Sequence, residues 1–187
     1  FGDKINEQLI KEMADRIVED GYRDLGYEYI IIDDCWSLRE RVDGKLVADP
    51  ALFPNGMKAL ADYIHSKGLK FGMYSCAGTK TCAGYTSILD APVDYEFSDA
   101  KQFAEWGVDY LKYDFCYFPV SGDAKNAYLT MAMALRSTGR DILFAACNWG
   151  MYDPSGWMRS HGAHSYRSTG DIFDGPKSYK DLFISQV

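Results

Sequence analysis

The chain of 187 residues has few cysteines and no long hydrophobic run, and both absences exclude classes of protein. No apolar stretch approaches the roughly 20 residues of a transmembrane helix, so we expect no membrane insertion. Five cysteines are too few for a disulfide scaffold, and their spacing lacks the paired short intervals of a structural zinc site. Because the number is odd, at least one cysteine is unpaired within the chain.

Net positive charge is also lacking, since 20 Lys and Arg are outnumbered by 27 Asp and Glu and the formal net charge is -7. This balance argues against a nucleic-acid partner and against attraction to an anionic membrane. No Gly-x-Gly-x-x-Gly or Walker-type loop follows a predicted strand, which disfavours nucleotide binding. The chain has no Asn-x-Ser/Thr sequon, and its first residues carry no signal-peptide pattern, although a cleaved signal would leave none. Neutral or cationic small molecules remain as partners.

Helical patterns alternate with short apolar runs along the whole chain. The predicted helices lie at 6–20, 54–67, 98–106 and 124–137, with a short one at 155–160 and another that begins at Pro176. The predicted strands lie at 29–32, 69–74, 108–114, 141–147 and 164–168. Glycine follows each of the first four helices, as expected for a left-handed C-cap. This alternation indicates βαβ units and a parallel sheet in one domain.

Five strands are too few for a complete (β/α)8 TIM barrel, which typically has about 250 residues. We therefore expect residues 1–187 to form a partial (β/α)8 catalytic domain with about five of the eight βα units. A doubly wound sheet is the alternative, but its phosphate-binding signature is missing.

Polar and aromatic side chains lie at or just after the end of every predicted strand. In chain order these residues are Asp33 and Asp34, Tyr74, Lys112 and Asp114, Cys147 and Trp149, and Arg167 and Asp171. The carboxyl ends of parallel strands meet at one edge of a sheet, so we expect all of these side chains on one face. Carboxylates, cations and aromatic rings together suit a site that hydrogen-bonds a polyol and stacks on its apolar ring face. The pattern predicts a sugar site.

Two carboxylates in this set favour glycosidase chemistry. Lys112 lies two residues before Asp114 on the same strand face, so its ammonium can hold the carboxylate ionised, as a nucleophile requires. Asp171 follows Gly170 in a loop, which suits a proton donor to a leaving oxygen. A carboxyl separation of about 5–5.5 Å indicates retention and a wider one inversion, and the sequence does not give that distance.

Five motifs in this order resemble the α-galactosidases of glycoside hydrolase family 27. They are Tyr29-x3-Asp33-Asp34-Cys35-Trp36, Ala48-Asp49-Pro50 with Phe53-Pro54-x-Gly56, 65–70 (HSKGLK), 106–114 (WGVDYLKYD) and 166–171 (YRSTGD). The resemblance implies a (β/α)8 barrel and a retaining mechanism, with Asp114 as nucleophile and Asp171 as acid/base. It also implies that the galactose pocket, without metal or cofactor, is lined by Asp33, Asp34, Tyr74, Lys112, Cys147, Trp149 and Arg167.

The resemblance carries further expectations about the rest of the protein. Cys82 and Cys116 match a pair that is disulfide-bonded in relatives, which would fit a secreted or lysosome-like compartment, whereas a reduced pair would fit the cytoplasm. The family's first strand is expected before Phe1, and its last strands and C-terminal β domain after Val187. A homodimer is left open, and an α-galactoside oligosaccharide or glycoconjugate is the expected substrate.

Several positions depart from the family pattern, and more than one function stays open. Phe115 stands where glycine or asparagine is usual, Cys76 where aspartate is usual, and Asn148 where glutamate or serine is common near the 2-substituent. Tyr152 should crowd an acetamido group, which favours α-galactosidase over α-N-acetylgalactosaminidase. A β-L-arabinopyranosidase of the same family, a metal-dependent barrel hydrolase or isomerase, and a non-catalytic sugar-binding fragment also stay open.

Overall fold

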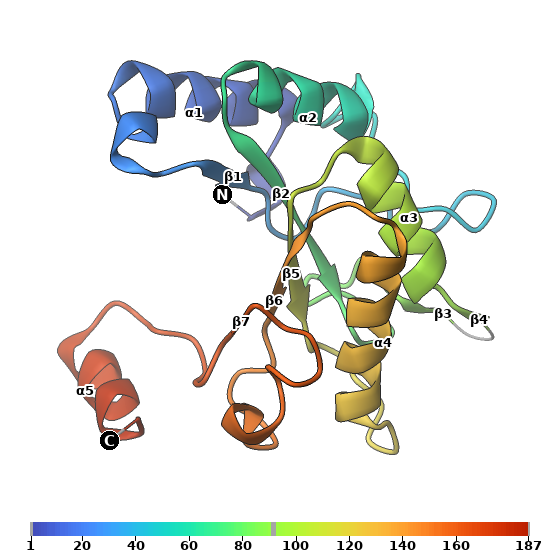
Figure 1. Cartoon of the computed structure of the whole chain (residues 1–187), viewed down its shortest axis with the longest axis vertical. Coiled ribbons are helices and arrows are strands. Elements are labelled where there is room, and N and C mark those ends of the chain that lie inside the picture. Colours follow the sequence, from blue (N-terminus) through green and yellow to red (C-terminus); the bar gives the residue numbers. More distant parts are fainter. Residues whose placement is uncertain (1, 91–92, 187) are drawn as a thin grey trace.

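The computed structural model describes residues 2–90 and 93–186 and is built on a five-stranded parallel sheet (Figure 1). The strands run in the order β1-β2-β5-β6-β7, and all their pairings are parallel. Their bounds are Tyr29–Ile31 for β1, Lys70–Cys76 for β2, Tyr110–Asp114 for β5, Leu143–Ala146 for β6 and Ser165–Tyr166 for β7. A separate antiparallel pair consists of β3 (Leu89–Asp90) and β4 (Val93–Asp94).

Helices connect the strands and cover the outside of the sheet. In Figure 1, α1 (Glu7–Glu19) and α2 (Gly56–Ser66) lie above it, while α3 (Glu96–Trp106) and α4 (Ala124–Ser137) lie on its right. Along the chain, α1 contacts α2, α2 contacts α3 and α3 contacts α4. The C-terminal helix α5 (Pro176–Ile184) lies apart from them at the lower left, and three short 3-10 turns are Gly2–Lys4, Arg23–Leu25 and Pro154–Gly156.

The strand order distinguishes a partial barrel from a doubly wound sheet. A doubly wound sheet reverses its strand order at a switch point and has helices on both faces. Here the order in space follows the order in the chain, and helices α1 to α4 form one arc outside the sheet (Figure 1). The alternative of a doubly wound sheet is therefore excluded, and the arrangement is the predicted one, that of successive βα units of a (β/α)8 barrel.

Local signals explain where the helices begin and end. The Asn6 side chain accepts a hydrogen bond from the Leu9 backbone N–H at 2.9 Å and caps α1, and Asp123 caps α4 in the same way. The predicted C-terminal glycines all have positive φ, for example 84° at Gly107. The apolar core lies between strands and helices, where Leu60 of α2 and Phe103 of α3 are fully buried.

Two local predictions were wrong, and one pair of strands was missed. Pro54 does not open α2, which begins at Gly56 after a turn. The expected helix at 155–160 is only the 3-10 turn Pro154–Gly156. Asp153, which precedes it, has a left-handed backbone conformation, and its side chain makes no capping hydrogen bond. The β3–β4 pair was not predicted, since two-residue strands are too short to show an alternating pattern.

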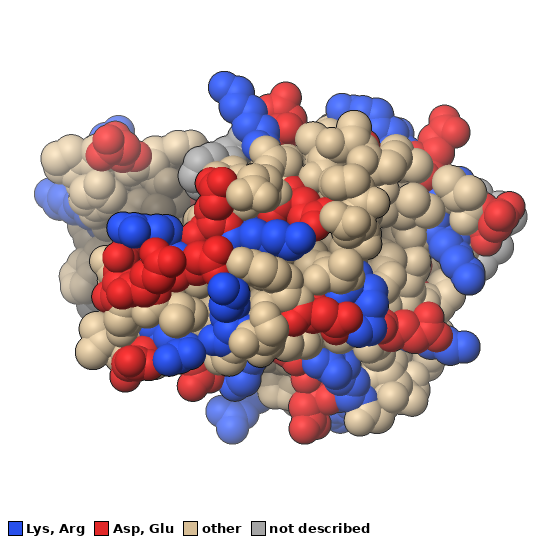
Figure 2. Space-filling view, turned by 90° about the horizontal axis from the view of Figure 1, so that it is seen from above, with Lys and Arg blue, Asp and Glu red and all other residues tan. Residues whose placement is uncertain are grey.

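Charged side chains are paired and mixed on the surface. In Figure 2 acidic and basic groups alternate over the visible face rather than gathering by sign. For example, Lys67, which follows α2, pairs with Asp15 of α1 at 2.6 Å. Within the described residues, no helix has the length and apolar character needed to cross a bilayer.

At the amino ends of the strands, Asp109 ties three elements together. Its carboxylate accepts hydrogen bonds from the Phe71 backbone N–H at 2.9 Å and from Arg140 Nη2 at 2.5 Å, and it lies 2.7 Å from His65 Nε2. Burial opposes ionisation, but these partners together lower the pKa of Asp109. In barrels this end serves stability, while chemistry lies at the opposite end.

We predict that Leu111→Ala destabilises the full-length protein by about 2–5 kcal/mol, because it removes a fully buried side chain from β5. Denaturant unfolding would measure the loss. The exposed Met133→Ala on α4 is the control and should change stability by less than about 0.5 kcal/mol. Equal effects of the two substitutions would contradict the placement of β5 in the core.

Candidate active site at the carboxyl ends of the strands

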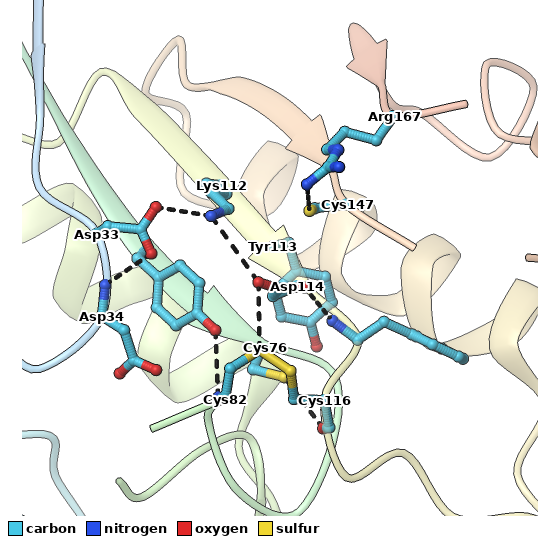
Figure 3. A network of polar contacts seen from close by, with 12 residues as sticks. Asp33, Asp34, Cys76, Cys82, Lys112, Tyr113, Asp114, Cys116, Cys147 and Arg167 are labelled. Atoms are coloured by element: carbon cyan, nitrogen blue, oxygen red, sulfur yellow. Dashed lines mark hydrogen bonds and ion pairs between the residues drawn. A yellow bond between two sulfur atoms is a disulfide. The ribbon is translucent and has the colours of Figure 1, made fainter. Parts of the chain in front are cut away.

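Asp114 is the last residue of β5 and points into a polar cluster that three strands supply (Figure 3). The residue is only 5% exposed. Its Oδ1 accepts a hydrogen bond from the Phe115 backbone N–H at 2.9 Å, and its Oδ2 lies 3.9 Å from Lys112 Nζ and 3.5 Å from Cys82 Sγ. A buried carboxylate with these neighbours is aimed at the space over the strand ends.

Burial raises the pKa of Asp114, whereas the Phe115 N–H, the Lys112 charge and the side chains of Tyr74 and Cys147 lower it. The net direction is upward. Lys112 therefore lowers the pKa of Asp114, as predicted, but the loss of hydration on burial raises that pKa by more. The sequence could not indicate this, because the penalty depends on how deeply packing buries the carboxylate.

Lys112 contacts carboxylates on both sides. Its Nζ donates a hydrogen bond to Asp33 Oδ2 at 2.6 Å, which is shorter than its 3.9 Å separation from Asp114, and it lies 5.1 Å from the centroid of the Tyr74 ring. Burial disfavours the ammonium, but the hydrogen bond to Asp33 and the charges of Asp33 and Asp114 raise the pKa of Lys112 overall. The side chain is thus a charged bridge from the end of β1 to the end of β5.

Asp33 and Asp34 follow β1 and have different surroundings. Asp33 is exposed, and its Oδ1 accepts a hydrogen bond from the Asp34 N–H at 2.8 Å. Asp34 Oδ2 accepts from the Ala83 N–H at 2.8 Å, which joins it to the loop after β2. Sequence reasoning missed Ala83, because a backbone donor leaves no signal in residue type.

A disulfide joins the loops after β2 and β5. Cys82 and Cys116 are bonded with their Cα atoms 5.0 Å apart, as the resemblance implied. The Cys82 N–H donates to the Tyr74 hydroxyl at 3.4 Å, and a Cβ placed on Gly78 would lie 1.8 Å from the Cys116 carbonyl oxygen. Glycine is therefore required where the two loops touch.

The thiols near Asp114 are poor metal ligands. Among the described residues, the one group able to converge on a metal ion is Cys82, Asp114 and Cys116, and its two sulfurs are already bonded to each other. The buried Cys76 thiol donates to the Cys116 carbonyl at 3.2 Å, and burial raises its pKa to about 12. Neither arrangement offers the thiolates that soft metals prefer.

Arg167 and Asp171 form the other side of the cluster. Arg167 Nη1 donates to Asp171 Oδ1 at 2.6 Å and lies 3.8 Å from the buried Cys147 Sγ (Figure 3 shows the latter contact). Burial raises the pKa of Cys147 to about 11, which keeps it a neutral thiol near pH 7. The Asp171 side chain is 67% exposed, so this carboxyl faces solvent while Asp114 is buried.

The remaining predicted residue, Trp149, lies beside an aromatic cluster centred on Phe115. Phe115 stacks on Phe118 with ring centroids 4.5 Å apart, and the rings of Trp149 and Tyr152 meet it edge-on. Trp149 is half-buried against the hydrophobic core. Phe115, which departs from the family pattern, thus packs against other rings behind the end of the strand.

Asn148, the other departure near this cluster, is fully buried. Its side-chain amide donates a hydrogen bond to the Met151 carbonyl at 2.5 Å.

Comparisons with known proteins agree with this geometry. The sequence profile of the family described as Alpha galactosidase A matches residues 2–186. An α-galactosidase of Cyamopsis tetragonoloba is 49% identical over 183 residues, which are 97% of this chain and 43% of that protein. The crystal structure of α-galactosidase I from Mortierella vinacea has a TM-score of 0.87 and 45% identity, and the match covers 92% of this chain and 44% of that one.

The chain belongs to the α-galactosidase family, glycoside hydrolase family 27. Its partial (β/α)8 fold is thereby confirmed. The chain spans less than half the length of these relatives. A family 27 β-L-arabinopyranosidase from Geobacillus stearothermophilus, with a TM-score of 0.81 but only 22% identity, shares the fold.

We predict that Lys112→Met moves the acid limb of the kcat/KM–pH profile of the full-length family member upward by about 1 pH unit. Lys112 lowers the pKa of Asp114, so its loss raises that pKa, and Asp114, which the sequence predicts to be the nucleophile, then ionises at a higher pH. The control Lys70→Met removes a lysine paired with Glu28 at the amino end of β2 and should leave the profile in place. An unmoved acid limb in Lys112→Met would refute the coupling.

Proposed function

We propose that the protein to which this chain belongs is a retaining α-galactosidase that removes terminal α-linked D-galactose. The observation that carries the proposal is that two carboxyls at the carboxyl ends of the strands have different surroundings. Asp114 is buried beside an ammonium, and Asp171 is exposed beside a guanidinium. Two carboxyls in different environments suit the nucleophile and acid/base roles of glycoside hydrolysis.

In the first step of the proposed mechanism, an Asp114 carboxylate oxygen attacks the anomeric carbon as the bond from that carbon to the leaving oxygen breaks. The Asp171 carboxyl gives its proton to the leaving oxygen, and a β-linked galactosyl ester forms on Asp114. In the second step, Asp171 takes a proton from water, the water oxygen attacks the anomeric carbon and the ester breaks. Two inversions return the α configuration.

The residues around Asp114 provide a binding site for sugar hydroxyls. Asp33 and Asp34 offer carboxylate oxygens suited to the 4-OH and 6-OH of galactose, and Lys112 offers a donor. The Saccharomyces cerevisiae α-galactosidase, solved with raffinose, is 44% identical over 92% of this chain with a TM-score of 0.86. We infer that an α-galactoside oligosaccharide of similar chemistry is a substrate.

Three competing functions have weaker support. Lys112 and Arg167 already pair with the carboxylates that a divalent ion would need, which disfavours a metal-dependent barrel enzyme. Relatives at 46–49% identity are named α-galactosidases, whereas the arabinopyranosidase likeness is 22% identical. A non-catalytic sugar-binding protein would not need the buried Asp114 and exposed Asp171 together.

We propose that the protein works in an oxidising compartment, since the Cys82–Cys116 bond joins the two loops beside Asp114. Mass spectrometry of thiol-blocked, non-reduced protein from its natural source should detect the Cys82 and Cys116 peptides linked together. Recovery of both cysteines blocked as free thiols would contradict the proposal and favour the cytoplasm.

We predict that Asp114→Asn and Asp171→Asn each lower turnover of an α-galactosyl disaccharide by more than about 1,000-fold in the full-length protein. Asp62→Asn on α2, which removes a surface carboxylate, is the control and should keep full activity. Azide should rescue Asp114→Gly with a β-galactosyl azide product, because it attacks the substrate directly with inversion. An absence of wild-type activity on every α-galactoside would overturn the proposed function.

A further inference from the structure

We propose that Gly150 is a positioning residue for the acid/base loop, a role that rests on the proposed function of Asp171. Gly150 lies in the turn after β6 with φ at +81°. A Cβ on this residue would lie 2.2 Å from the Ser168 carbonyl oxygen, 2.8 Å from the Ser168 carbonyl carbon and 3.3 Å from the Thr169 nitrogen. The turn after β6 and the loop that leads to Asp171 are therefore in backbone-to-backbone contact.

The turn that carries Gly150 is held on both sides. The Met151 N–H donates to the Asn148 carbonyl at 2.9 Å, and the Asn148 side-chain amide donates back to the Met151 carbonyl at 2.5 Å. Asn148 is fully buried, and the Tyr152 carbonyl accepts a hydrogen bond from Trp157 Nε1 at 2.7 Å. Trp149 has φ at 56°, a rare conformation for a bulky residue that this network maintains. The turn is thus the fixed side of the contact.

The facing loop is anchored at one end and exposed beyond it. The Arg167 N–H donates to the Ala146 carbonyl at 3.0 Å, which continues the β6–β7 ladder. After that residue the chain leaves the sheet, and Asp171 is held by its ion pair with Arg167 at 2.6 Å. A Cβ on Gly170 would meet nothing within 4 Å. The contact of Ser168 with Gly150 therefore sets how closely this loop approaches the strand ends.

An added methyl group at position 150 would displace the loop and not the turn. Ordinary contact begins at 3.4 Å, so the Ser168 carbonyl would have to retreat by about 1.2 Å. Asp171 lies three residues further along and would move with it, while Asp114 keeps its own contacts on β5. Misplacement by 1 Å can cost about 100-fold in rate, and proton transfer depends on hydrogen-bond reach. We therefore expect the substitution at position 150 to slow the proton transfers that Asp171 would make.

The test is Gly150→Ala in the full-length protein, assayed with two substrates. An α-galactosyl disaccharide has a poor leaving group and needs the proton from Asp171, so its kcat/KM should fall by about 100-fold. Dinitrophenyl α-galactoside has a good leaving group and needs no proton, so its kcat/KM should change little. Azide should raise kcat for the second substrate and yield α-galactosyl azide, because it replaces the water that Asp171 would activate.

Two further variants separate the collision from backbone strain. Gly139→Ala has a similar φ of +74°, but a Cβ there meets nothing within 4 Å, so it should keep the wild-type ratio of the two kcat/KM values. Gly150→Asn adopts a positive φ more readily than alanine yet still carries a Cβ, so it should reproduce the leaving-group dependence.

Three results would overturn the inference: equal losses on both substrates, no loss on either, or failure of both Gly150 variants to fold while Gly139→Ala folds. In the last case the glycine would be a folding requirement and not a positioning residue. A wild-type protein that hydrolyses no α-galactoside would instead refute the proposed function, so the two failures are distinguishable.

Discussion

The ammonium of Lys112 is the charge on which the candidate site depends. It lies between a carboxylate from the end of β1 and another at the end of its own strand, over the ring of a tyrosine on β2. Carboxylates brought together without a cation would raise one another's pKa and repel. The parallel sheet creates the crowding, because it directs every strand end to one edge. Lys112 makes that crowding compatible with ionised side chains.

Backbone contacts between loops form a second layer of organisation. The loop after β2 touches the loop after β5 at Gly78, and the turn after β6 touches the loop after β7 at Gly150. The Cys82–Cys116 disulfide reinforces the first contact. Neighbouring βα loops thus support one another in pairs, one pair beside Asp114 and one beside Asp171. This arrangement lets the proposed acid/base Asp171 lie on a loop and still have a defined position.

Much of the fold was predictable because its signals are local. Helix periodicity, caps and C-terminal glycines depend on residues a few positions apart, and the four main helices and five parallel strands were found from them. The β3–β4 pair and the short turn at 154–156 were missed or misjudged, since they are too brief to have a period. The one-edge clustering of polar residues was also predictable, because it follows from parallel strands alone.

The sequence by itself determined which residues reach the site: the apolar run before Asp114, the acidic pair after β1 and the arginine four positions before Asp171. Only the tertiary structure decided how they interact. Lys112 lies closer to Asp33 than to Asp114, and burial outweighs its effect on the pKa of Asp114. The backbone of Gly150 lies so close to the loop that leads to Asp171 that a Cβ would not fit there. The physical reason is that desolvation and contact distance depend on packing between distant segments, whereas periodicity records only the local chain.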